Sequence, residues 1–197
     1  MLNGMVLECA HAEWKRGKMG KSEAKGQPRW IDKGLPDVRD VPDSQRAEPP
    51  DILEQGATSE DALHILCAAL GMPEDADRVS LASPIGPVAA MRDKLPHIVE
   101  KRKDGRERYA NFAASTVIAP YEVWRVAYDD GSFRLAFIGL FAGKQQLLVV
   151  VDVEDGQVLW NMMNCDAKAL NKHRHGTLIY SVRGDVAADV QEAPEAA

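Results

Sequence analysis

The sequence predicts an α+β fold in which N-terminal helices are followed by a small antiparallel sheet of about four strands. Two observations lead to this class. Apolar residues recur at helical spacing in the first half of the chain, and in the second half short apolar runs alternate with turns that contain glycine. The run QQLLVVVDV at 145–153 is apolar at nearly every position, which predicts a central strand.

The first helix is expected between Thr58 and Gly71. Thr58 or Ser59 can cap its N-terminus, and Gly71 followed by Pro73 ends it. The apolar residues at helical spacing predict one buried stripe, made of Leu63, Leu66, Cys67 and Leu70. A free cysteine in such a stripe is expected to be a core residue.

A short hairpin is expected at 78–91 and a second helix at 95–114, with Pro96 in the first turn of that helix. Gly105 in the helix interior costs about 1 kcal/mol relative to alanine. If the helix is continuous, one stripe of its surface carries His97, Lys101, Asp104 and Arg108.

The second half of the chain is expected to form the sheet. Turns with glycine or charged residues separate strands at 122–128, 132–141, 145–153 and 157–163. A short helix capped by Asp166 follows and ends at Gly176, and a last strand is expected at 177–182.

The chain is expected to divide into segments of different character. These are an extended, poorly patterned arm at 1–50, a helix with a short hairpin at 51–91 that packs on the core, an α+β domain at 92–182 and a disordered acidic tail at 183–197. Three apolar side chains are expected to anchor the arm, namely Trp14, Trp30 and Leu35.

Composition excludes several classes of protein. Of the 197 residues, 45% are hydrophobic and 27% are charged, so the chain is neither generally disordered nor collagen-like. It contains no apolar run of about 18 residues that could cross a membrane. The three cysteines are scattered and show no CxxC spacing, which argues against a disulfide framework and favours a reducing compartment.

Net charge is unevenly distributed along the chain. It is −6 in total, with −5 over 1–89, +2 over 90–180 and −3 over 181–197. Two basic clusters lie at 101–108 and 171–175. They contain arginine and lysine, the types of side chain that bind phosphate groups in proteins. The alternative is that each cluster is an ordinary solvated surface, which a pair such as Lys103 and Glu107 would help to form on a helix.

These residues suggest the parts of a ribonuclease that needs no metal ion. A base removes the proton of a ribose 2′-hydroxyl, an acid protonates the leaving 5′-oxygen, and cations stabilise the phosphorane. The candidates for these roles are His97, Lys101, Arg108 and Arg174, and the candidates for holding the substrate are Arg102, Arg106, Asn161, Asn171 and Lys172. No metal site is expected from Cys165, His173 and His175, because the two rings point apart on a helix and a fourth ligand is missing.

Seven segments carry a resemblance to a known family. They are WIDKGLPDVRDVP (30–42), LPHIVEKRKDGRERYANF (95–112), APYEVW (119–124), FIGLF (137–141), LLVVVDV (147–153), LWNMM (159–163) and LNKHRHGTLIY (170–180). In order and spacing they resemble the C-terminal domain of Mu-type phage head morphogenesis proteins, which is grouped with barnase, EndoU, colicin and RelE nucleases. The resemblance runs from Trp30 to Tyr180.

The resemblance implies a barnase/RelE-like sheet with N-terminal helices and cleavage of RNA without a metal or other cofactor. It also implies a phage or prophage protein, located in the cytoplasm of a bacterial host or in the virion. Twelve positions match the polar pattern of the family: His97, Glu100, Lys101, Arg102, Arg106, Arg108, Tyr109, Glu122, Trp124, Asn161, Asn171 and Arg174. Asn161 departs from relatives that carry Thr or Ser near this position, because its amide cannot act as an alcohol.

Two functions remain open at this point, so enzymatic activity is not assigned. One is a toxin-like endoribonuclease, and the other is a non-catalytic head-assembly module that binds portal or capsid protein. The first is favoured if the basic residues converge on one concave surface. The second is favoured if they are dispersed or engaged in internal ion pairs, since a buried pair of an arginine and a glutamate would give the same polar pattern without catalysis.

Overall fold

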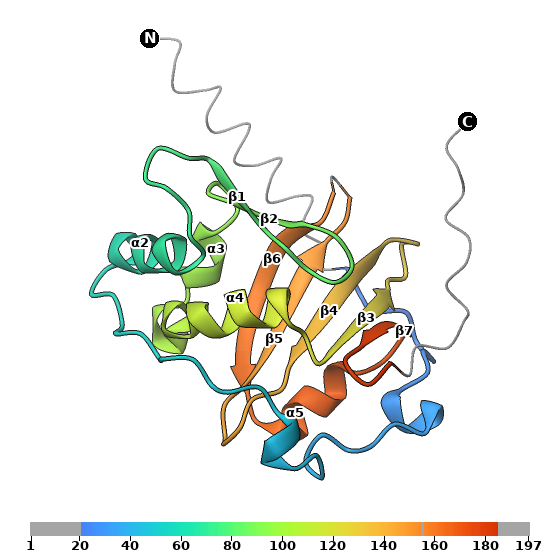
Figure 1. Ribbon diagram of the computed structural model, residues 1–197. Helices are drawn as coiled ribbons and strands as arrows, with labels where there is room; N and C mark the ends of the chain where they lie inside the picture. Colours follow the sequence, from blue (N-terminus) through green and yellow to red (C-terminus); the bar gives the residue numbers. More distant parts are fainter. Residues whose placement is uncertain (1–20, 155, 185–197) are drawn as a thin grey trace.

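Figure 1 shows the chain as a computed structural model, which describes residues 21–154 and 156–184. One mixed sheet has the strand order β1-β2-β6-β5-β4-β3-β7. The strands are β1 (Arg78–Leu81), β2 (Val88–Met91), β3 (Glu122–Ala127), β4 (Phe133–Gly139), β5 (Gln146–Asp152), β6 (Val158–Cys165) and β7 (Thr177–Ser181). The helices are α2 (Ser59–Ala69), α3 (Pro96–Val99), α4 (Ala110–Ile118) and α5 (Ala167–Leu170), with 3-10 turns η1 (Trp30–Lys33), η2 (Asp43–Gln45), η3 (Arg102–Asp104), η4 (Arg106–Tyr109) and η5 (Asn171–His173). Cys9, Trp14 and residues 185–197 of the expected tail lie outside the described residues.

The α+β class is confirmed, but the sheet has seven strands where about four were expected. Strands β3 to β6 form the expected antiparallel meander, with β5 between β4 and β6. Strand β7 extends it by pairing with β3, and the β1–β2 hairpin joins β6 through one parallel pair, Ala89 and Val158. Turn signals reveal neighbouring strands of a hairpin, whereas these additions depend on contacts between distant parts of the chain.

The first expected helix is confirmed as α2. The backbone N–H of Asp61 donates to the Thr58 hydroxyl at 3.1 Å, and the backbone N–H of Thr58 donates to the Asp61 carboxylate at 3.0 Å. This reciprocal arrangement satisfies amide groups that would otherwise lack acceptors at the start of the helix. Leu66 and Cys67 are buried in the core, as the apolar stripe predicts.

The expectation of a continuous helix at 95–114 is wrong. Helix α3 ends at Val99, the turns η3 and η4 follow, and α4 begins only at Ala110. Gly105 separates the two turns with a φ of +50°, a left-handed conformation that cannot continue an α-helix. The shared stripe of His97, Lys101, Asp104 and Arg108 therefore does not form.

Helices α2, α3 and α4 cover one face of the sheet, and α5 with the N-terminal arm covers part of the other. Helix α4 lies across β4 and β5 in Figure 1, and the core beneath it includes Phe137 and Val149. On the opposite face, Trp124 and Ile138 form a second core with α5, and the partly buried Trp30 and Leu35 pack against it. Trp30 and Leu35 thus anchor the arm, as expected. The residues of the arm that precede Trp30 run toward the end of β3.

Candidate active site on the sheet

Residues 21–30, called here the N-terminal strap, run beside the end of β3. Glu23 pairs with Tyr128 in an antiparallel bridge, and the backbone N–H of Ala24 donates to the Ala127 carbonyl at 2.9 Å. The Gln27 side chain accepts from the Ala127 N–H at 2.8 Å and donates to its carbonyl at 3.0 Å. Strand β7 pairs with β3 only as far as Arg125, so the strap occupies the edge that β7 leaves free.

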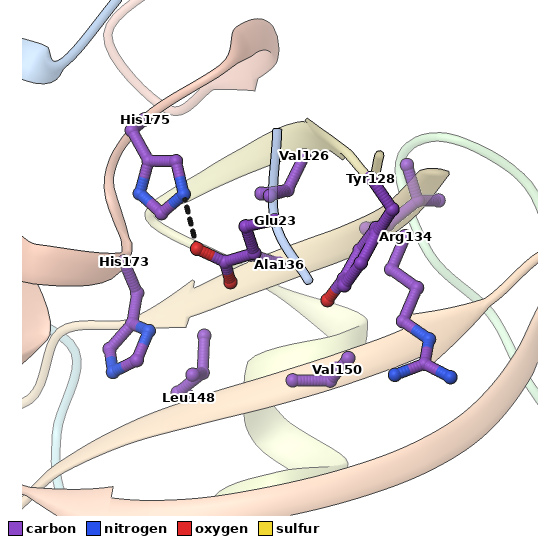
Figure 2. A pocket seen from close by; sticks show the side chains of 10 residues that line it. Glu23, Val126, Tyr128, Arg134, Ala136, Leu148, Val150, His173 and His175 are labelled. Atoms are coloured by element: carbon purple, nitrogen blue, oxygen red, sulfur yellow. Dashed lines mark hydrogen bonds and ion pairs between the residues drawn. The ribbon is translucent and has the colours of Figure 1, made fainter. Parts of the chain in front are cut away.

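A small pocket lies between the strap and the face of the sheet opposite α4 (Figure 2). Its volume is about 30 Å³. Its apolar floor consists of alternate strand residues that point to this face, Val126, Ala136, Leu148 and Val150. Its polar lining comes from Glu23, Tyr128, Arg134, His173 and His175. The pocket thus joins basic, acidic and phenolic groups on one surface.

His175 is held between two acceptors. Its Nδ1 lies 2.9 Å from the carbonyl oxygen of Lys172, and its Nε2 lies 3.1 Å from Oε2 of Glu23. A carbonyl and a carboxylate can only accept, so both contacts are hydrogen bonds when both ring nitrogens carry protons. His175 therefore has a hydrogen-bond acceptor within reach of each ring nitrogen.

His173 lies in surroundings that favour its neutral form. Burial lowers the pKa of His173, and the nearby positive charges of His175 and Lys172 add to this effect, while Glu23 opposes it. The neutral ring can accept a proton. The pocket thus contains one histidine suited to accepting a proton and a second histidine whose two ring nitrogens both face acceptors.

The His-x-His pattern had been expected on a helix, with its rings pointing apart, and this is wrong. Turn η5 ends at His173, and Arg174 is no longer helical, with φ −95° and ψ 71°. The chain therefore leaves helical geometry between the two histidines. His173 and His175 therefore both line the pocket, while the intervening Arg174 is fully buried.

Arg134 and Tyr128 supply the other polar groups of the pocket wall. The Arg134 Nε donates to Oδ2 of Asp152 at 3.0 Å, which fixes the guanidinium. Its central carbon lies 5.4 Å from the ring centre of Tyr128 and 5.1 Å from that of Trp160. Burial raises the pKa of Tyr128, so its hydroxyl keeps its proton near neutral pH and can donate a hydrogen bond.

His97 lies at the end of this row of contacts, beside β6. Its ring centre is 4.7 Å from that of Trp160, whose other neighbour is Arg134. On the next residue of β6, Oδ1 of Asn161 accepts from Nη1 of Arg106 at 2.7 Å. The structure thus brings His97, Arg106 and Asn161 to one stretch of β6, and Arg134 connects that stretch to the pocket.

Arg174 and Asn171 lie in the second core instead. Nε and Nη2 of Arg174 donate to the two carboxylate oxygens of Glu122, each at 2.7 Å, and both side chains are fully buried. Nη1 of Arg174 donates to Asn171 at 2.8 Å, and the Asn171 amide donates to Asp37 at 2.7 Å. Arg174 lies beside β3, whereas His97 lies beside β6. Strands β4 and β5 separate the two residues.

The remaining candidate residues are dispersed. Nη2 of Arg102 forms an ion pair with the buried Glu107 at 2.8 Å. Nε of Arg108 donates to the Leu53 carbonyl at 3.3 Å, on the side of the helices. Lys101 and Lys172 are exposed. The site residues expected from the sequence are therefore dispersed. Some lie beside β6, some on the face covered by α2 to α4, some in the second core and some in solvent.

Sequence reasoning missed the residues that dominate the pocket. Arg134, Tyr128 and Glu23 belong to no motif, and only the sheet register and the strap bring them together. The described side chains include no group of three or more His, Cys, Asp or Glu placed to hold a metal ion. Within the same ranges, none of the helices combines the length and apolar character that crossing a membrane requires.

Comparison with known proteins identifies the sheet domain. A family model described as phage-Barnase-EndoU-ColicinE5/D-RelE like nuclease2 matches residues 71–181, from the end of α2 to the end of β7. No curated protein and no solved structure matches the chain. The matched range includes both pocket histidines and the strands that form the pocket floor, whereas the strap precedes it. Since the match covers more than half of the 197 residues, the chain belongs to the phage-Barnase-EndoU-ColicinE5/D-RelE like nuclease2 family.

Proposed function

We propose that the chain is a metal-independent endoribonuclease whose active site is the pocket of Figure 2. The observation that carries the proposal is the pair His173 and His175, which line one pocket: burial lowers the pKa of His173, and both ring nitrogens of His175 face hydrogen-bond acceptors. Membership of a phage nuclease family supports the class of reaction. Two oppositely protonated groups are what acid–base cleavage of a phosphodiester requires.

In the proposed reaction His173 is the base and His175 is the acid. Neutral His173 takes the proton of a ribose 2′-hydroxyl, and the oxygen attacks the adjacent phosphorus. The bond from phosphorus to the 5′-oxygen breaks, and protonated His175 gives its proton to that oxygen. The products are a 2′,3′-cyclic phosphate and a 5′-hydroxyl, and the two histidines exchange protonation states.

Arg134 and Tyr128 are placed to stabilise the phosphorane. The guanidinium carries a permanent charge, and the protonated phenol can donate to an equatorial oxygen. Asp152 fixes Arg134 through the 3.0 Å hydrogen bond, so its donors are oriented before the substrate arrives. His97, Arg106 and Asn161 would contact the RNA farther along, over β6. This is the substrate-holding role that the sequence suggests for Arg106 and Asn161, whereas His97, a candidate for catalysis from the sequence, would here only bind.

The test is cleavage of a labelled RNA oligonucleotide in EDTA. We expect His173→Asn and His175→Asn each to lower the cleavage rate by roughly 100-fold or more, which is the usual worth of a general acid or base. His64→Asn is the matched control, because His64 is an exposed histidine of α2, on the helical side. A substrate with 2′-deoxyribose at every position should resist cleavage.

His97 provides the decisive comparison between the two candidate centres. His97→Asn is expected to have a smaller effect than either pocket variant if His97 only contacts RNA over β6. Loss of activity in His97→Asn alone, with full activity in both pocket variants, would move the reaction to the Trp160 side. RNA that stays intact with every folded preparation from pH 5 to pH 9 would sink the ribonuclease proposal.

A second candidate function is non-catalytic binding in phage head assembly. The observation in its favour is that Arg102, Asn171 and Arg174 are engaged inside the protein and are not presented to a substrate. This candidate predicts that the chain sediments with procapsids or binds portal protein in pull-down experiments. It loses its support if RNA is cleaved and neither protein is bound.

A further inference from the structure

The strap places an acidic side chain in the pocket that is proposed to bind a phosphate. Glu23 Oε2 lies 3.1 Å from Nε2 of His175, and Figure 2 shows the carboxylate directed at that ring over the apolar floor. A carboxylate and a phosphate are both oxyanions that accept hydrogen bonds from an imidazolium. Glu23 thus occupies the position that an anionic substrate would need.

The strap lies outside the part of the chain that matches the nuclease family, residues 71–181. It is attached by main-chain hydrogen bonds, including Ala24 to Ala127 at 2.9 Å, Asp129 to Ser22 at 3.0 Å and Gly176 to Pro28 at 2.8 Å. Lys21 adds ion pairs with Asp130 and Glu154. The backbone therefore holds Glu23 over the histidines independently of the carboxylate contact itself.

The space that remains beside Glu23 is small. The cavity of about 30 Å³ has room for one or two water molecules but not for a phosphodiester with its two sugars. A substrate must therefore displace the Glu23 side chain or part of the strap. The carboxylate is half-exposed, with 49% of the side-chain surface accessible, so its ion pair with His175 is weak enough to exchange.

We propose that Glu23 is an internal competitor for the anion site, which keeps the pocket closed to phosphate until a substrate displaces the strap. The proposal rests on the proposed function in taking the ligand to be a phosphate group of RNA. It assigns a role to a segment outside the matched nuclease range. It also accounts for an acidic side chain that lines the same pocket as two histidines and an arginine in a nuclease-family chain.

The experiment uses inorganic phosphate as the probe and the full chain at a single pH. Binding is followed by the NMR signals of the His173 and His175 rings. We expect Glu23→Gln to bind phosphate roughly 3- to 10-fold more tightly than the wild type, because a negative charge next to the anion is removed. Glutamine keeps the size of the side chain, so thermal unfolding should be unchanged.

Glu54→Gln is the matched control, since it makes the same change of net charge at an exposed position beside Leu53, which packs on the helical side. Equal affinity in the wild type and Glu23→Gln, or equal tightening in both variants, would overturn the proposal. The phosphate assay does not depend on RNA cleavage. If Glu23→Gln binds phosphate more tightly and no RNA is cleaved, the competitor role stands and the ribonuclease proposal falls. If RNA is cleaved and Glu23→Gln changes neither the cleavage rate nor the phosphate affinity, the ribonuclease proposal stands and the competitor role falls.

Discussion

Arg174 and Glu122 form a fully buried ion pair in which two guanidinium nitrogens donate to the two carboxylate oxygens, each at 2.7 Å. The same carboxylate accepts from the indole of Trp124 at 2.8 Å. Because Arg174 lies between the two pocket histidines in sequence, the pair fixes the segment that presents them. The ion pair is therefore expected to stabilise the fold and to orient the two histidines of the pocket.

Arg174→Ala should lower the free energy of unfolding by about 3 kcal/mol, because it removes the two-point partner of the buried Glu122 carboxylate and leaves only the longer ion pair with Arg183, at 3.5 Å. Urea denaturation followed by circular dichroism measures the change. Arg39→Ala is the control, since the Arg39 side chain is 58% exposed in its ion pair with Asp37 and should therefore change the stability much less. A similar small loss in both variants would contradict the assigned role of Arg174.

The lowered pKa of His173 predicts a dependence of stability on pH. In the unfolded chain His173 titrates near 6.5, whereas burial makes protonation harder in the folded protein. As the pH falls below about 6.5 the unfolded state binds the proton first, so stability is lost between that value and the lower folded pKa. His173→Asn should flatten the slope of unfolding free energy against pH in this window, and an NMR titration should place the His173 pKa below its ordinary value. A His173 ring that titrates above 6.5 would contradict the prediction.

Arg134 is expected to be essential for cleavage but not for folding. Arg134→Gln should reduce the cleavage rate by roughly 100-fold, since it removes the charge proposed to stabilise the phosphorane. Arg125→Gln is the matched control, because Arg125 is an exposed arginine on the neighbouring strand that lies over the Phe133 ring, 4.0 Å from its centre. Equal cleavage rates for the two variants would remove Arg134 from the proposed site.

Gly176 is expected to tolerate no side chain. Its φ is +96°, and a Cβ atom would lie 2.2 Å from the carbonyl oxygen of Arg125 in the backbone of β3. Gly176→Ala should therefore cost about 3 kcal/mol from strain and overpacking together. Gly131→Ala separates the two causes, because Gly131 has a φ of +82° with nothing within 4 Å of the added atom and should cost only about 1–2 kcal/mol. Thermal unfolding of both variants measures the difference, and equal losses would rule out the clash.

The secondary structure was largely predictable from the sequence because its signals are local. The Thr58 cap, the apolar stripe of α2 and the four strands of the meander all follow from neighbouring residues. The prediction of one helix at 95–114 was wrong because the residues at helical spacing continue across Gly105, while the backbone there adopts a positive φ. The predicted number of strands in the sheet was too low, because β7 pairs with β3 and β2 pairs with β6. Both pairings join residues that are far apart in the chain.

The candidate site was predictable only in part. The basic cluster at 171–175 does reach the sheet pocket, but through His173 and His175 and not through Arg174, whose side chain is buried. His97, Arg106 and Asn161 do gather beside β6. Composition cannot distinguish an arginine that faces solvent from one that closes a buried ion pair, because both have the same side chain in a polar segment.

The sequence by itself determined the α+β class, the strands of the meander and, through its motifs, the resemblance to a phage nuclease family. Those properties depend on periodicity, capping and the order of short segments, which are local. Tertiary structure alone decided that Glu23 faces His175, that Arg134 lies between Tyr128 and Trp160, and that Arg174 pairs with Glu122. These relationships depend on sheet register and on the path of the strap, where burial and charge pairing between distant residues determine which side chains meet.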